Sequence, residues 1–543
     1  MERNLERLIA APHDLLIIGG GIHGLAAAYD AAQRGLSVAL VERGDFGSGA
    51  SFNHLKTVHG GLRYLQSGDL PRVRESIHER SALARMAPHL LTPLPYLIPT
   101  SRKLTRSRTA LRAAFALDAA LGHDRNRGVV PSLHLPTGRI VSRDECLRLF
   151  PGVPARPVTG AALWYDYQMR NPDRLTLAFA LAADRHSACL ANYVEALEPV
   201  IAGGRVVAVR SRDLMTGTTF DIPARVVLNA AGAAAGVFMR SFACREDVLL
   251  IKAMNVVTAR PGSGPALGSS TRDGRLLFAV PWQGRVMVGT SHGERPCAPD
   301  DLDVSGSELE SFLREINEAF PALDLHLSDI TLVHRGVVPA VRRHDGTLAL
   351  AGHHHIRNHA RDGVGGAVSV IGAKYTTGRR VAELAVDVVM AELGRPAARG
   401  RTALEPLPGG ELTSLPDAIR DARQTHGSWL DGEAVAHLVE TYGSQYNLVT
   451  ELARREPALA TRLTPACVVL RAEVAHAVRA EMAQHLVDVV ARRTPLGSAG
   501  HPGDAAARAA AAIMQQELGW DDASTAREIA SLTGFYAPVR GQP

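Results

Sequence analysis

The sequence predicts an α/β protein whose parallel sheet carries a dinucleotide at its carboxyl edge, and three observations predict this. Residues 15–18 (Leu-Leu-Ile-Ile) form a short apolar run, typical of a parallel strand covered on both faces. Gly19, Gly21 and Gly24 follow with G-x-G-x-x-G spacing and open an alanine-rich helical stretch. A second apolar stretch, residues 37–41, ends in Glu42. This order of strand, glycine turn, helix, strand and acid is typical of a Rossmann-type nucleotide-binding unit.

Each residue of this motif has a mechanical role. Gly19 permits the tight turn, Gly21 lets the backbone approach a pyrophosphate, and Gly24 lets the helix lie close to the strand. The helix N-terminus then faces the phosphates. The carboxylate of Glu42, 18 residues after Gly24, is placed to bind a ribose hydroxyl. The motif therefore predicts FAD or NAD as the cofactor.

Two later segments repeat the pattern of a buried strand that ends in small residues. Residues 226–229 are followed by Ala230, Ala231 and Gly232, and residues 367–371 are followed by Gly372. Small residues are expected where the backbone passes close to a cofactor. The nucleotide domain is therefore expected to be assembled from separated pieces of the chain.

Other stretches indicate two further parts of the protein. Alternating runs such as residues 285–288 favour an antiparallel sheet over the active site. Apolar residues at three- and four-residue spacing in residues 433–442 and 473–492 favour amphipathic helices. The predicted division is a cofactor domain of residues 14–95, 155–240 and 335–395, a substrate domain of residues 96–154 and 245–334, a proline-rich linker of residues 396–410 and a C-terminal helical domain of residues 411–543.

Composition excludes several classes of protein. A chain of 543 residues, 46% of them hydrophobic, is long enough for roughly two to four domains with sizeable cores. Its five cysteines include no C-x-x-C pair, which argues against a disulfide framework or a zinc site and suits a reducing cytoplasm. No apolar run approaches the roughly 20 residues that span a bilayer, and the N-terminus mixes charges too closely for a signal peptide. A net charge of +5 does not indicate a nucleic-acid partner.

A locally basic segment lies within residues 102–112. Its basic residues are Arg102, Lys103, Arg106, Arg108 and Arg112. Leu111, Phe115 and Leu121 follow at helical spacing, so one face of a helix here can meet anionic headgroups while the apolar side faces inward or toward lipid. An ordinary solvated helix face explains the same pattern, and both interpretations stay open.

Residues 43–65 add a signature beyond the glycine turn. The segment Lys56-Thr-Val-His59-Gly-Gly-Leu-Arg-Tyr-Leu resembles Ser-Lys-Leu-Ile-His-Gly-Gly-Leu-Arg-Tyr-Leu of the FAD-dependent glycerol-3-phosphate dehydrogenases. Residues 372–379 (Gly-Ala-Lys-Tyr-Thr-Thr-Gly-Arg) resemble that family's Gly-Gly-Lys-Leu-Thr-Thr-Tyr-Arg, and residues 471–494 resemble its helical tail. The resemblance covers nearly the whole chain. It implies FAD as the cofactor, bound by a Rossmann-type domain of the glutathione-reductase-like or DAO-like kind, with an antiparallel-sheet substrate domain and a C-terminal all-α domain.

The resemblance also implies roles for individual residues. Arg63 and Tyr64 are expected on the substrate side, with Arg63 binding the substrate's charge, and Lys374, His59 and Arg357 complete the catalytic set. A lysine desolvated beside the flavin has a lowered pKa and can serve as an acid or a base. The alternative for His59 is a hydrogen-bonded structural histidine. Together with the glycine motif, the predicted cofactor-binding residues are Gly19, Gly21, Gly24, Glu42, Arg43, Ser48, Ser51, Lys56, His59, Gly60, Gly61, Ala231, Gly232, Gly372, Lys374 and Thr376.

The predicted substrate pocket departs from the family pattern at three places. Val338 stands in Gly-Val-Val-Pro where the family has Gly-Val-Arg-Pro, so an arginine associated with the substrate's phosphate is missing. Asn255 and His292 replace the last residues of the family's Lys-Gly-Ser-His and Gly-Thr-Thr-Asp. The candidates to restore the lost charge are Arg335, Arg342 and Arg343.

Three functions are therefore open. The first is oxidation of sn-glycerol 3-phosphate to dihydroxyacetone phosphate by hydride transfer to flavin N5, with electrons passed to a quinone. The second is oxidation of another small polyol, a hydroxy acid or an amine on the same scaffold. The third, a non-enzymatic flavoprotein, is disfavoured by the retained flavin motifs. The first implies a cytoplasmic enzyme at the inner face of the cytoplasmic membrane, and a homodimer stays open.

Four histidines, His353, His354, His355 and His359, lie in one short stretch. Adjacent histidines point in different directions, and no acid or cysteine stands at helical ligand spacing beside them, so no metal site is predicted. Because imidazole charges near neutral pH, a pocket lining is the favoured interpretation.

Overall fold

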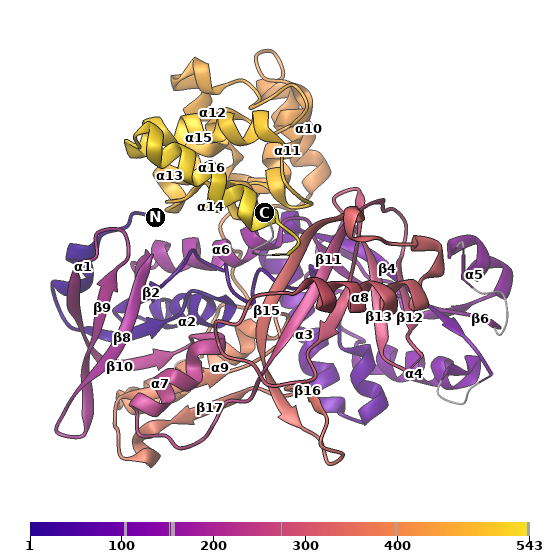
Figure 1. Ribbon diagram of the computed structural model, residues 1–543, viewed down its shortest axis with the longest axis horizontal. Helices are drawn as coiled ribbons and strands as arrows, with labels where there is room; N and C mark the ends of the chain where they lie inside the picture. The colour runs from indigo at the N-terminus through magenta and orange to yellow at the C-terminus, as the bar shows by residue number, and fades with distance from the viewer. Residues whose placement is uncertain (103–105, 151, 154–157, 273, 397–398, 540–543) are drawn as a thin grey trace.

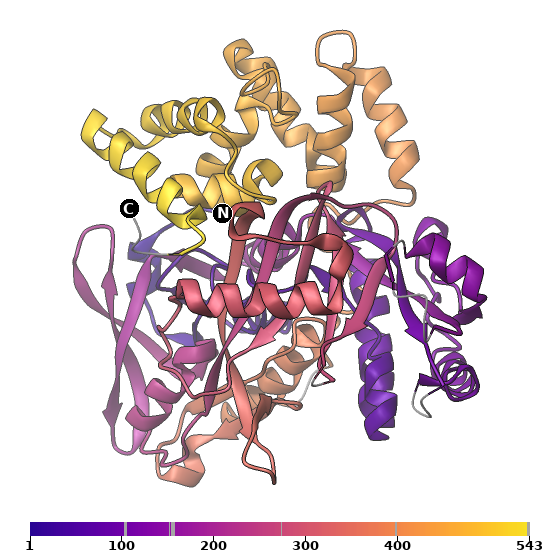
Figure 2. The same cartoon turned by 45° about the vertical axis from the view of Figure 1, so that its right-hand side comes forward.

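The computed structural model describes residues 1–102, 106–150, 152–153, 158–272, 274–396 and 399–539. Figure 1 shows two sheets side by side with a group of helices above them. The same three parts stay distinct when the view is turned by 45° (Figure 2). The upper group is the C-terminal part of the chain, coloured orange to yellow, and the N-terminus lies close to it (Figure 1).

The first sheet is parallel at its centre. Strand β1 pairs in parallel with β10 and β2, β10 with β18, and β2 with β7. In β1, Leu15 and Ile17 enter one apolar cluster while Leu16 and Ile18 enter another, which explains why this run does not alternate with polar residues. The strands, in order across the sheet, are β17 (His355–Asn358), β18 (Ala367–Ile371), β10 (Thr219–Asn229), β1 (His13–Ile18), β2 (Val38–Glu42) and β7 (Cys189–Asn192), with β8 (Val194–Ala202) and β9 (Arg205–Asp213) joined through β10.

Helices cover both faces of this sheet. The helices α2 (Ile22–Gln33), α6 (Pro172–Arg185) and α9 (Gly378–Glu392) supply the larger cluster. The short helices α1 (Leu5–Ile9) and α7 (Ala235–Ser241) supply the other, together with β8 and β9. Because parallel strands end at the same edge, the turns after β1, β2, β10 and β18 converge there.

The second sheet is almost entirely antiparallel, with β12 and β4 as its parallel pair in the described residues. Helix α8 (Gly306–Ala319) packs Leu309, Phe312 and Ile316 against it, and a capping box of Ser305 and Glu308 opens this helix. The strands, in order, are β16 (Leu348–Leu350), β15 (Ile330–Arg342), β11 (Leu250–Pro261), β14 (Arg285–His292), β13 (Leu276–Trp282), β12 (Ala266–Ser270), β4 (Leu91–Thr100), β6 (Gly160–Met169) and β3 (Thr57–Val58), with β5 (Arg139–Val141) beside β6.

The sheet to which each strand belongs bears on the predicted domain ranges, whose exact boundaries stay a prediction. Strands β3, β4, β6 and β15 lie in the second sheet, although the ranges 14–95, 155–240 and 335–395 place β3, β6, half of β4 and most of β15 with the cofactor domain. The physical reason is that β6 carries a ten-residue antiparallel ladder with β4, so the two strands cannot be separated. The helices α4 (Arg108–Leu121) and α5 (Arg143–Leu149) lie beside β6, whereas α3 (Leu70–Met86) buries Leu83 and Met86 in the cluster of α2, α6 and α9.

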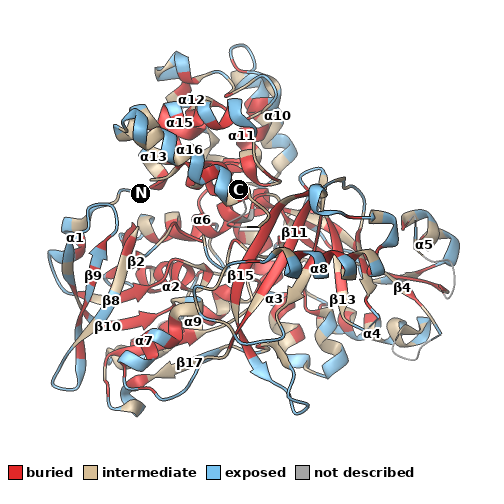
Figure 3. Cartoon of the chain, in the orientation of Figure 1, coloured by how far each residue is buried: buried red, intermediate tan, exposed pale blue. Residues whose placement is uncertain are grey.

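The C-terminal part is all helical in the described residues. Its core cluster also takes in Phe52, Trp282 and Leu332, so these helices pack on the second sheet rather than standing apart. Figure 3 shows their inner faces buried and their outer faces exposed. The helices are α10 (Leu415–His426), α11 (Gly432–Tyr442), α12 (Tyr446–Arg455), α13 (Arg471–Glu481), α14 (Leu486–Asp488), α15 (Asp504–Leu518) and α16 (Asp522–Tyr536). The α/β fold class with a C-terminal helical part is confirmed.

The predicted linker of residues 396–410 is packed against the cofactor domain over the residues that the structure describes. Leu407 is fully buried in the cluster of α2, α6 and α9, and its N–H donates to the carbonyl of Met86. Thr402 is buried and accepts from the Arg379 guanidinium. Residues 397 and 398 lie outside the described residues.

Buried ion pairs join the C-terminal helices to the turn after β2. Arg493 donates from Nη2 to Asp45 Oδ1 (2.6 Å) and from Nη1 to Oδ2 (2.8 Å), and Arg492 donates from Nε to Oδ2 (2.6 Å). Arg174 of α6 and Glu481 of α13 form a second buried pair at 2.6 Å. The helical part is thus tied to the cofactor side of the molecule by charges that water does not reach.

The basic segment falls partly on α4. Phe115 is buried, while Arg102, Arg108, Arg112 and Leu117 are exposed. Lys103 lies outside the described residues. Within those residues, the structure contains no helix that combines the length and the apolar character needed to cross a bilayer.

Candidate active site

The glycine turn after β1 is closed by backbone contacts that leave no room for side chains. Gly19 has φ +105°, and a Cβ there would lie 2.6 Å from the carbonyl oxygen of Ala230. A Cβ on Gly24 would lie 1.9 Å from the carbonyl oxygen of Gly19. The turn after β1 therefore lies directly against the turn after β10, which continues through Ala231 and Gly232.

The N-terminus of α2 begins at a glycine, which lets a phosphate approach its backbone. Its N-cap, Gly21, has extended backbone and no side chain to cap the helix. The Ile22 N–H donates to the Ser51 hydroxyl at 2.9 Å, so the predicted loop around Ser48 and Ser51 closes over this helix end. Backbone N–H groups and the helix dipole favour an anion at this point.

Glu42 lies at the end of β2, beside the glycine turn. Its carboxylate accepts from the N–H groups of Gly20 (2.6 Å) and Gly44 (2.7 Å). Burial raises the pKa of Glu42, and the two backbone hydrogen bonds oppose that shift. The acid is held where a ribose of a dinucleotide would lie. A glycine cradle, a helix end whose N-cap is a glycine, and this acid together fit FAD.

The loop between the glycine turn and β3 carries a buried lysine. Lys56 is 1% exposed, donates from Nζ to the carbonyl of Phe52, and lies 4.0 Å from Asp173. Burial lowers the pKa of Lys56 to about 8 and raises the pKa of Asp173 to about 6. The His54 ring stacks 4.7 Å from the ring of Tyr375. Lys56 therefore holds the loop before β3 through the carbonyl of Phe52 and lies close to Asp173 of α6.

A hollow of about 420 Å³, partly open to solvent, adjoins this edge of the sheet. Tyr64 and His59 approach it from the turn before α3, and Lys374 and Thr376 from the turn after β18. The His59 N–H donates to the Thr376 hydroxyl at 3.3 Å, which joins the two turns. The hollow lies beside the glycine cradle because Gly372 and His23 of α2 both line it.

The charges in this hollow are tuned by burial. Burial, followed by repulsion from Arg72 and Arg63, lowers the pKa of Lys374 to about 8. Burial lowers the pKa of His59 to about 4, so this imidazole is neutral at pH 7. Burial, followed by repulsion from Lys374, also lowers the pKa of His292 to about 4. A lysine that titrates near neutral pH therefore lies among neutral imidazoles.

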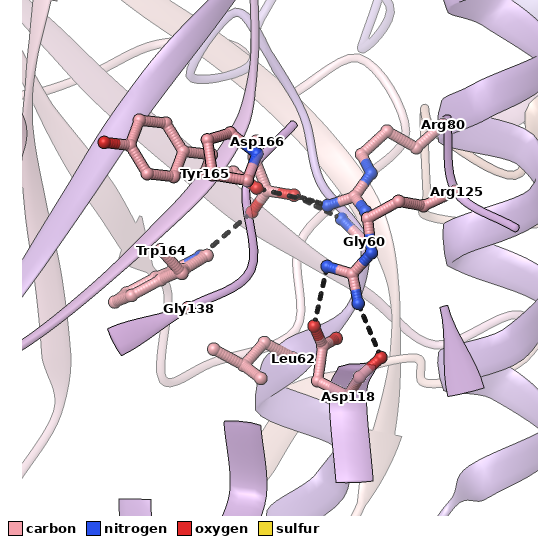
Figure 4. A pocket seen from close by; sticks show the side chains of 10 residues that line it. Gly60, Leu62, Arg80, Asp118, Arg125, Gly138, Trp164, Tyr165 and Asp166 are labelled. Atoms are coloured by element: carbon pink, nitrogen blue, oxygen red, sulfur yellow. Dashed lines mark hydrogen bonds and ion pairs between the residues drawn. The ribbon is translucent and has the colours of Figure 1, made fainter. Parts of the chain in front are cut away.

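A second, smaller cavity supports the turn that carries His59 (Figure 4). With open solvent included, as for the hollow, it encloses about 250 Å³, and the part that water can occupy is about 10 Å³, room for about one water molecule. Asp166 accepts from the Gly60 N–H (2.7 Å), from the Trp164 indole (3.1 Å) and from the Arg80 guanidinium. The carboxylate thereby fixes the backbone at Gly60, and Gly61, with φ +74°, continues the turn toward Tyr64.

The structure does not bring every predicted residue to the hollow. Arg63 is exposed and lies outside its lining, although it is close enough to lower the pKa of Lys374. Arg357 pairs with Asp362 at 2.5 Å and with Glu246 at 2.5 Å, and it also lies outside the lining. Arg43 is exposed next to Glu42.

The structure shows what surrounds Val338 and Asn255, two of the residues that depart from the family pattern. Val338 lies in β15 opposite Ile251 of β11. Asn255 is 1% exposed and accepts from the Thr290 hydroxyl at 2.7 Å, packed against Gly289. None of the three expected replacement arginines lines the hollow in the described residues. Arg335 donates to the carbonyls of Ala537 and Pro538, Arg342 donates to the carbonyl of Gly346, and Arg343 is exposed.

Several lining residues were not predicted as site residues. His353 and His354 line the hollow, which confirms the expected pocket lining, whereas His355 pairs with Glu246. Arg72, Glu75 and His23 also line it. Arg72 belongs to the first turn of α3, so only the fold of the preceding turn brings it there.

One group of possible metal ligands occurs in the described residues, formed by Cys244, His359 and Asp362. The His359 ring is hydrogen-bonded at both nitrogens, to Asp362 and to the Ser369 hydroxyl, each at 2.8 Å. Asp362 also carries the Arg357 guanidinium. These contacts account for the group as a polar network behind β18.

Comparison with protein families gives two matches that together cover most of the chain. A model described as FAD dependent oxidoreductase matches residues 14–387. A second, described as the C-terminal domain of alpha-glycerophosphate oxidase, matches residues 400–525. The first match contains both turns that line the hollow.

Curated proteins and a solved structure agree with these matches. The chain is 32% identical to "Glycerol-3-phosphate dehydrogenase" of Synechocystis over 91% of this chain and 90% of that protein. It is 31% identical to the protein of the same name from Mycobacterium leprae (97% and 88%) and 31% identical to the human mitochondrial enzyme (94% and 71%). The fold matches the glycerol-3-phosphate dehydrogenase of Bacillus halodurans, solved with FAD, with a TM-score of 0.77 at 24% identity over 98% of this chain and 96% of that one.

Proposed function

Because this chain belongs to the FAD-dependent oxidoreductases of the glycerol-3-phosphate dehydrogenase family, we propose that it oxidises sn-glycerol 3-phosphate to dihydroxyacetone phosphate. FAD is its cofactor. The observation that carries the choice of substrate is the hollow beside the glycine cradle, where Lys374, Tyr64 and the unpredicted Arg72 meet. The lysine and arginine that line this hollow suit a small anionic alcohol.

The chain's own residues would supply binding and proton transfer. When bound, FAD supplies the hydride acceptor. The Lys374 amine accepts the hydroxyl proton of the substrate, because its lowered pKa leaves an unprotonated fraction near neutral pH. Tyr64 forms the aromatic wall beside both cations, and the backbone N–H of His59 holds the turn through the Thr376 hydroxyl. Arg63 acts on Lys374 from outside the hollow, and the contacts of Arg357 support a structural role.

A pH profile tests the role of Lys374. We expect kcat/KM to rise with pH up to about 8 and then level, because the lysine must lose its proton before it can act as a base. Lys374→Met should remove this limb and lower kcat by about 100- to 10,000-fold. Lys252→Met is the matched control, since Lys252 pairs with Asp301 on the outer surface. A wild-type profile that is flat through pH 8 contradicts the role.

The substrate is tested by anaerobic reduction of the flavin. Added sn-glycerol 3-phosphate is expected to bleach the visible absorption band of the holoenzyme, while glycerol at the same concentration leaves it unchanged. One charge-assisted contact to the phosphate is worth about 1.5–3 kcal/mol, or roughly 10- to 100-fold in affinity. Bleaching by an unphosphorylated polyol, a hydroxy acid or an amine instead would favour the second candidate function, for which Val338, Asn255 and His292 are the motivating residues.

We propose further that electrons pass to a quinone at a membrane surface. The support is that Arg108, Arg112 and Leu117 of α4 are all exposed, as is Arg102 just before the helix. The substrate-reduced enzyme should be reoxidised faster by a quinone in anionic vesicles than by one in neutral vesicles. Equal rates would contradict the membrane part of the proposal, and no reoxidation would contradict the quinone as acceptor.

A homodimer also remains a proposal, which sedimentation of the holoenzyme would test.

A further inference from the structure

We propose that Arg72 binds the anionic end of the substrate and so replaces the arginine that is missing at position 338. This inference rests on the proposed function, since it names the residue that makes a phosphorylated alcohol preferred over an uncharged one. It concerns a residue that no motif of the sequence assigns to the site.

The position of Arg72 follows from the start of α3. Asp69 is the N-cap of this helix, and its carboxylate accepts from the Arg72 N–H at 3.3 Å. The Arg72 side chain then turns back over the ring of Tyr64, with its Cζ 4.0 Å from the ring centroid. Stacking on an aromatic face holds the plane of a guanidinium in place. The residue is therefore fixed in orientation before any ligand arrives.

The guanidinium has unused hydrogen-bonding capacity inside the hollow. Nη2 of Arg72 is buried and has no hydrogen-bond partner, and Arg72 forms no ion pair with the carboxylates that the structure describes. The backbone of Gly352 packs against the other side, where a Cβ would lie 3.1 Å from Nη1. A buried, unpaired donor is costly unless something accepts from it. An anionic ligand in the hollow would supply that acceptor.

The other charges around the hollow leave this task to Arg72. Its neighbour Asp69 faces His353 at 3.3 Å, and Glu75 is the acid that shares the lining with it. Lys374 lies 5.8 Å from the Tyr64 ring centroid, on the same aromatic wall. Since Lys374 must be uncharged to accept a proton, it cannot also be the permanent partner of the phosphate. An arginine stays charged throughout and presents two parallel donors to a phosphate.

Two of the three arginines expected to replace the missing one are engaged elsewhere, and the third, Arg343, is exposed outside the lining of the hollow. Arg335 donates to two carbonyls at the end of α16, and Arg342 donates to its own hairpin. Arg357 is paired with two carboxylates. By contrast, Arg72 combines a place in the lining, a fixed plane and an unsatisfied donor.

The test compares Arg72→Gln with Arg74→Gln in the FAD-bound enzyme. Arg74 is the matched control, because it lies on the same helix but pairs with Asp124 outside the hollow. Inorganic phosphate is the first probe, and its binding is followed by perturbation of the flavin spectrum. We expect Arg72→Gln to weaken phosphate binding and to raise KM for sn-glycerol 3-phosphate, each by about 10- to 100-fold. Arg74→Gln should change both by less than about twofold.

Two readouts separate this inference from the proposed function. If sn-glycerol 3-phosphate reduces the wild-type flavin but Arg72→Gln binds phosphate as tightly as the wild type, Arg72 is not the anion site and the function stands. If the wild type binds phosphate through Arg72 but is not reduced by sn-glycerol 3-phosphate, the function fails and the anion site stands. No phosphate binding to the wild type would also overturn the inference.

A second variant guards against loss of folding. Arg72→Lys keeps a cation but loses the forked pair of donors, so phosphate binding should fall by about tenfold and the preference for phosphorylated over unphosphorylated substrate should survive. If Arg72→Gln loses its FAD, phosphate binding and KM of Arg72→Lys are the measurements that test the inference. Wild-type affinity in Arg72→Lys, together with an unchanged KM, would then count against a role for the fork.

Discussion

Asp45→Ala is expected to lower the free energy of unfolding by about 3–5 kcal/mol, because the change leaves buried guanidinium groups without their counter-charge. Asp45 accepts three hydrogen bonds from Arg492 and Arg493, and all three side chains are at most 5% exposed. Asp488 can still pair with Arg492, at 2.5 Å, but Arg493 has no other carboxylate within ion-pair distance in the described residues. The measurement is the denaturation midpoint of wild type and variant at pH 7.

The exposed pair of Asp504 and Arg508 provides the control. Both side chains are more than 60% exposed, so Asp504→Ala should leave the midpoint unchanged within error. If both variants behave alike, the buried pair does not hold the C-terminal helices to the loop. Because Asp45 lies three residues after Glu42, its loss should also weaken retention of FAD.

The same pair gives the stability a defined dependence on pH. Burial raises the pKa of Asp45, but Arg493 and Arg492 outweigh it and hold this pKa below its usual value of 3.8. The unfolded chain therefore binds a proton at higher pH than the folded one, and the stabilisation is present above about pH 4 and is lost as the pH falls below that value. Asp45→Ala should show a flatter acid limb than the wild type.

The cofactor-binding side of the molecule could be predicted from local sequence, because the residues that form it lie close together in the chain. The apolar run of β1, the turn at Gly19 and the helix α2 are consecutive, and Glu42 comes one strand later. The small residues after β10 and β18 indicate the same edge because parallel strands must end together. The resemblance adds Tyr64, His59 and Lys374, which the structure brings to one hollow.

The contacts that sequence could not indicate are those set by distant parts of the chain. Asp45 and Arg493 are 448 positions apart, and neither residue carries a local signal of its partner. Arg335 lies in β15, the strand that lacks the family arginine, yet its guanidinium donates to the carbonyl of Ala537 just after α16, 202 positions later. Arg72 reaches the hollow only because the turn at Gly61 and Gly68 folds α3 back over Tyr64. Charge alone therefore could not rank these arginines.

The largest effect on cofactor binding is expected from Gly24→Ala. The added Cβ would lie 1.9 Å from the carbonyl oxygen of Gly19. Because that oxygen belongs to the backbone, no side-chain rotation relieves the clash. Helix α2 would have to move away from β1 and carry its N-terminus away from the pyrophosphate. Overpacking of this kind costs about 1–3 kcal/mol or more, so affinity for FAD should fall by at least about 10- to 100-fold.

The measurement for this variant is the ratio of flavin to protein after purification, followed by titration of the apoprotein with FAD. Gly534→Ala serves as the control, since nothing lies within 4 Å of its Cβ position in α16 and alanine favours a helix there. If Gly24→Ala kept its flavin with wild-type affinity, α2 would not be held against β1 at this point. The shape of the cradle would then be set by the loop at Ser51, whose hydroxyl accepts from the Ile22 N–H at the start of the helix.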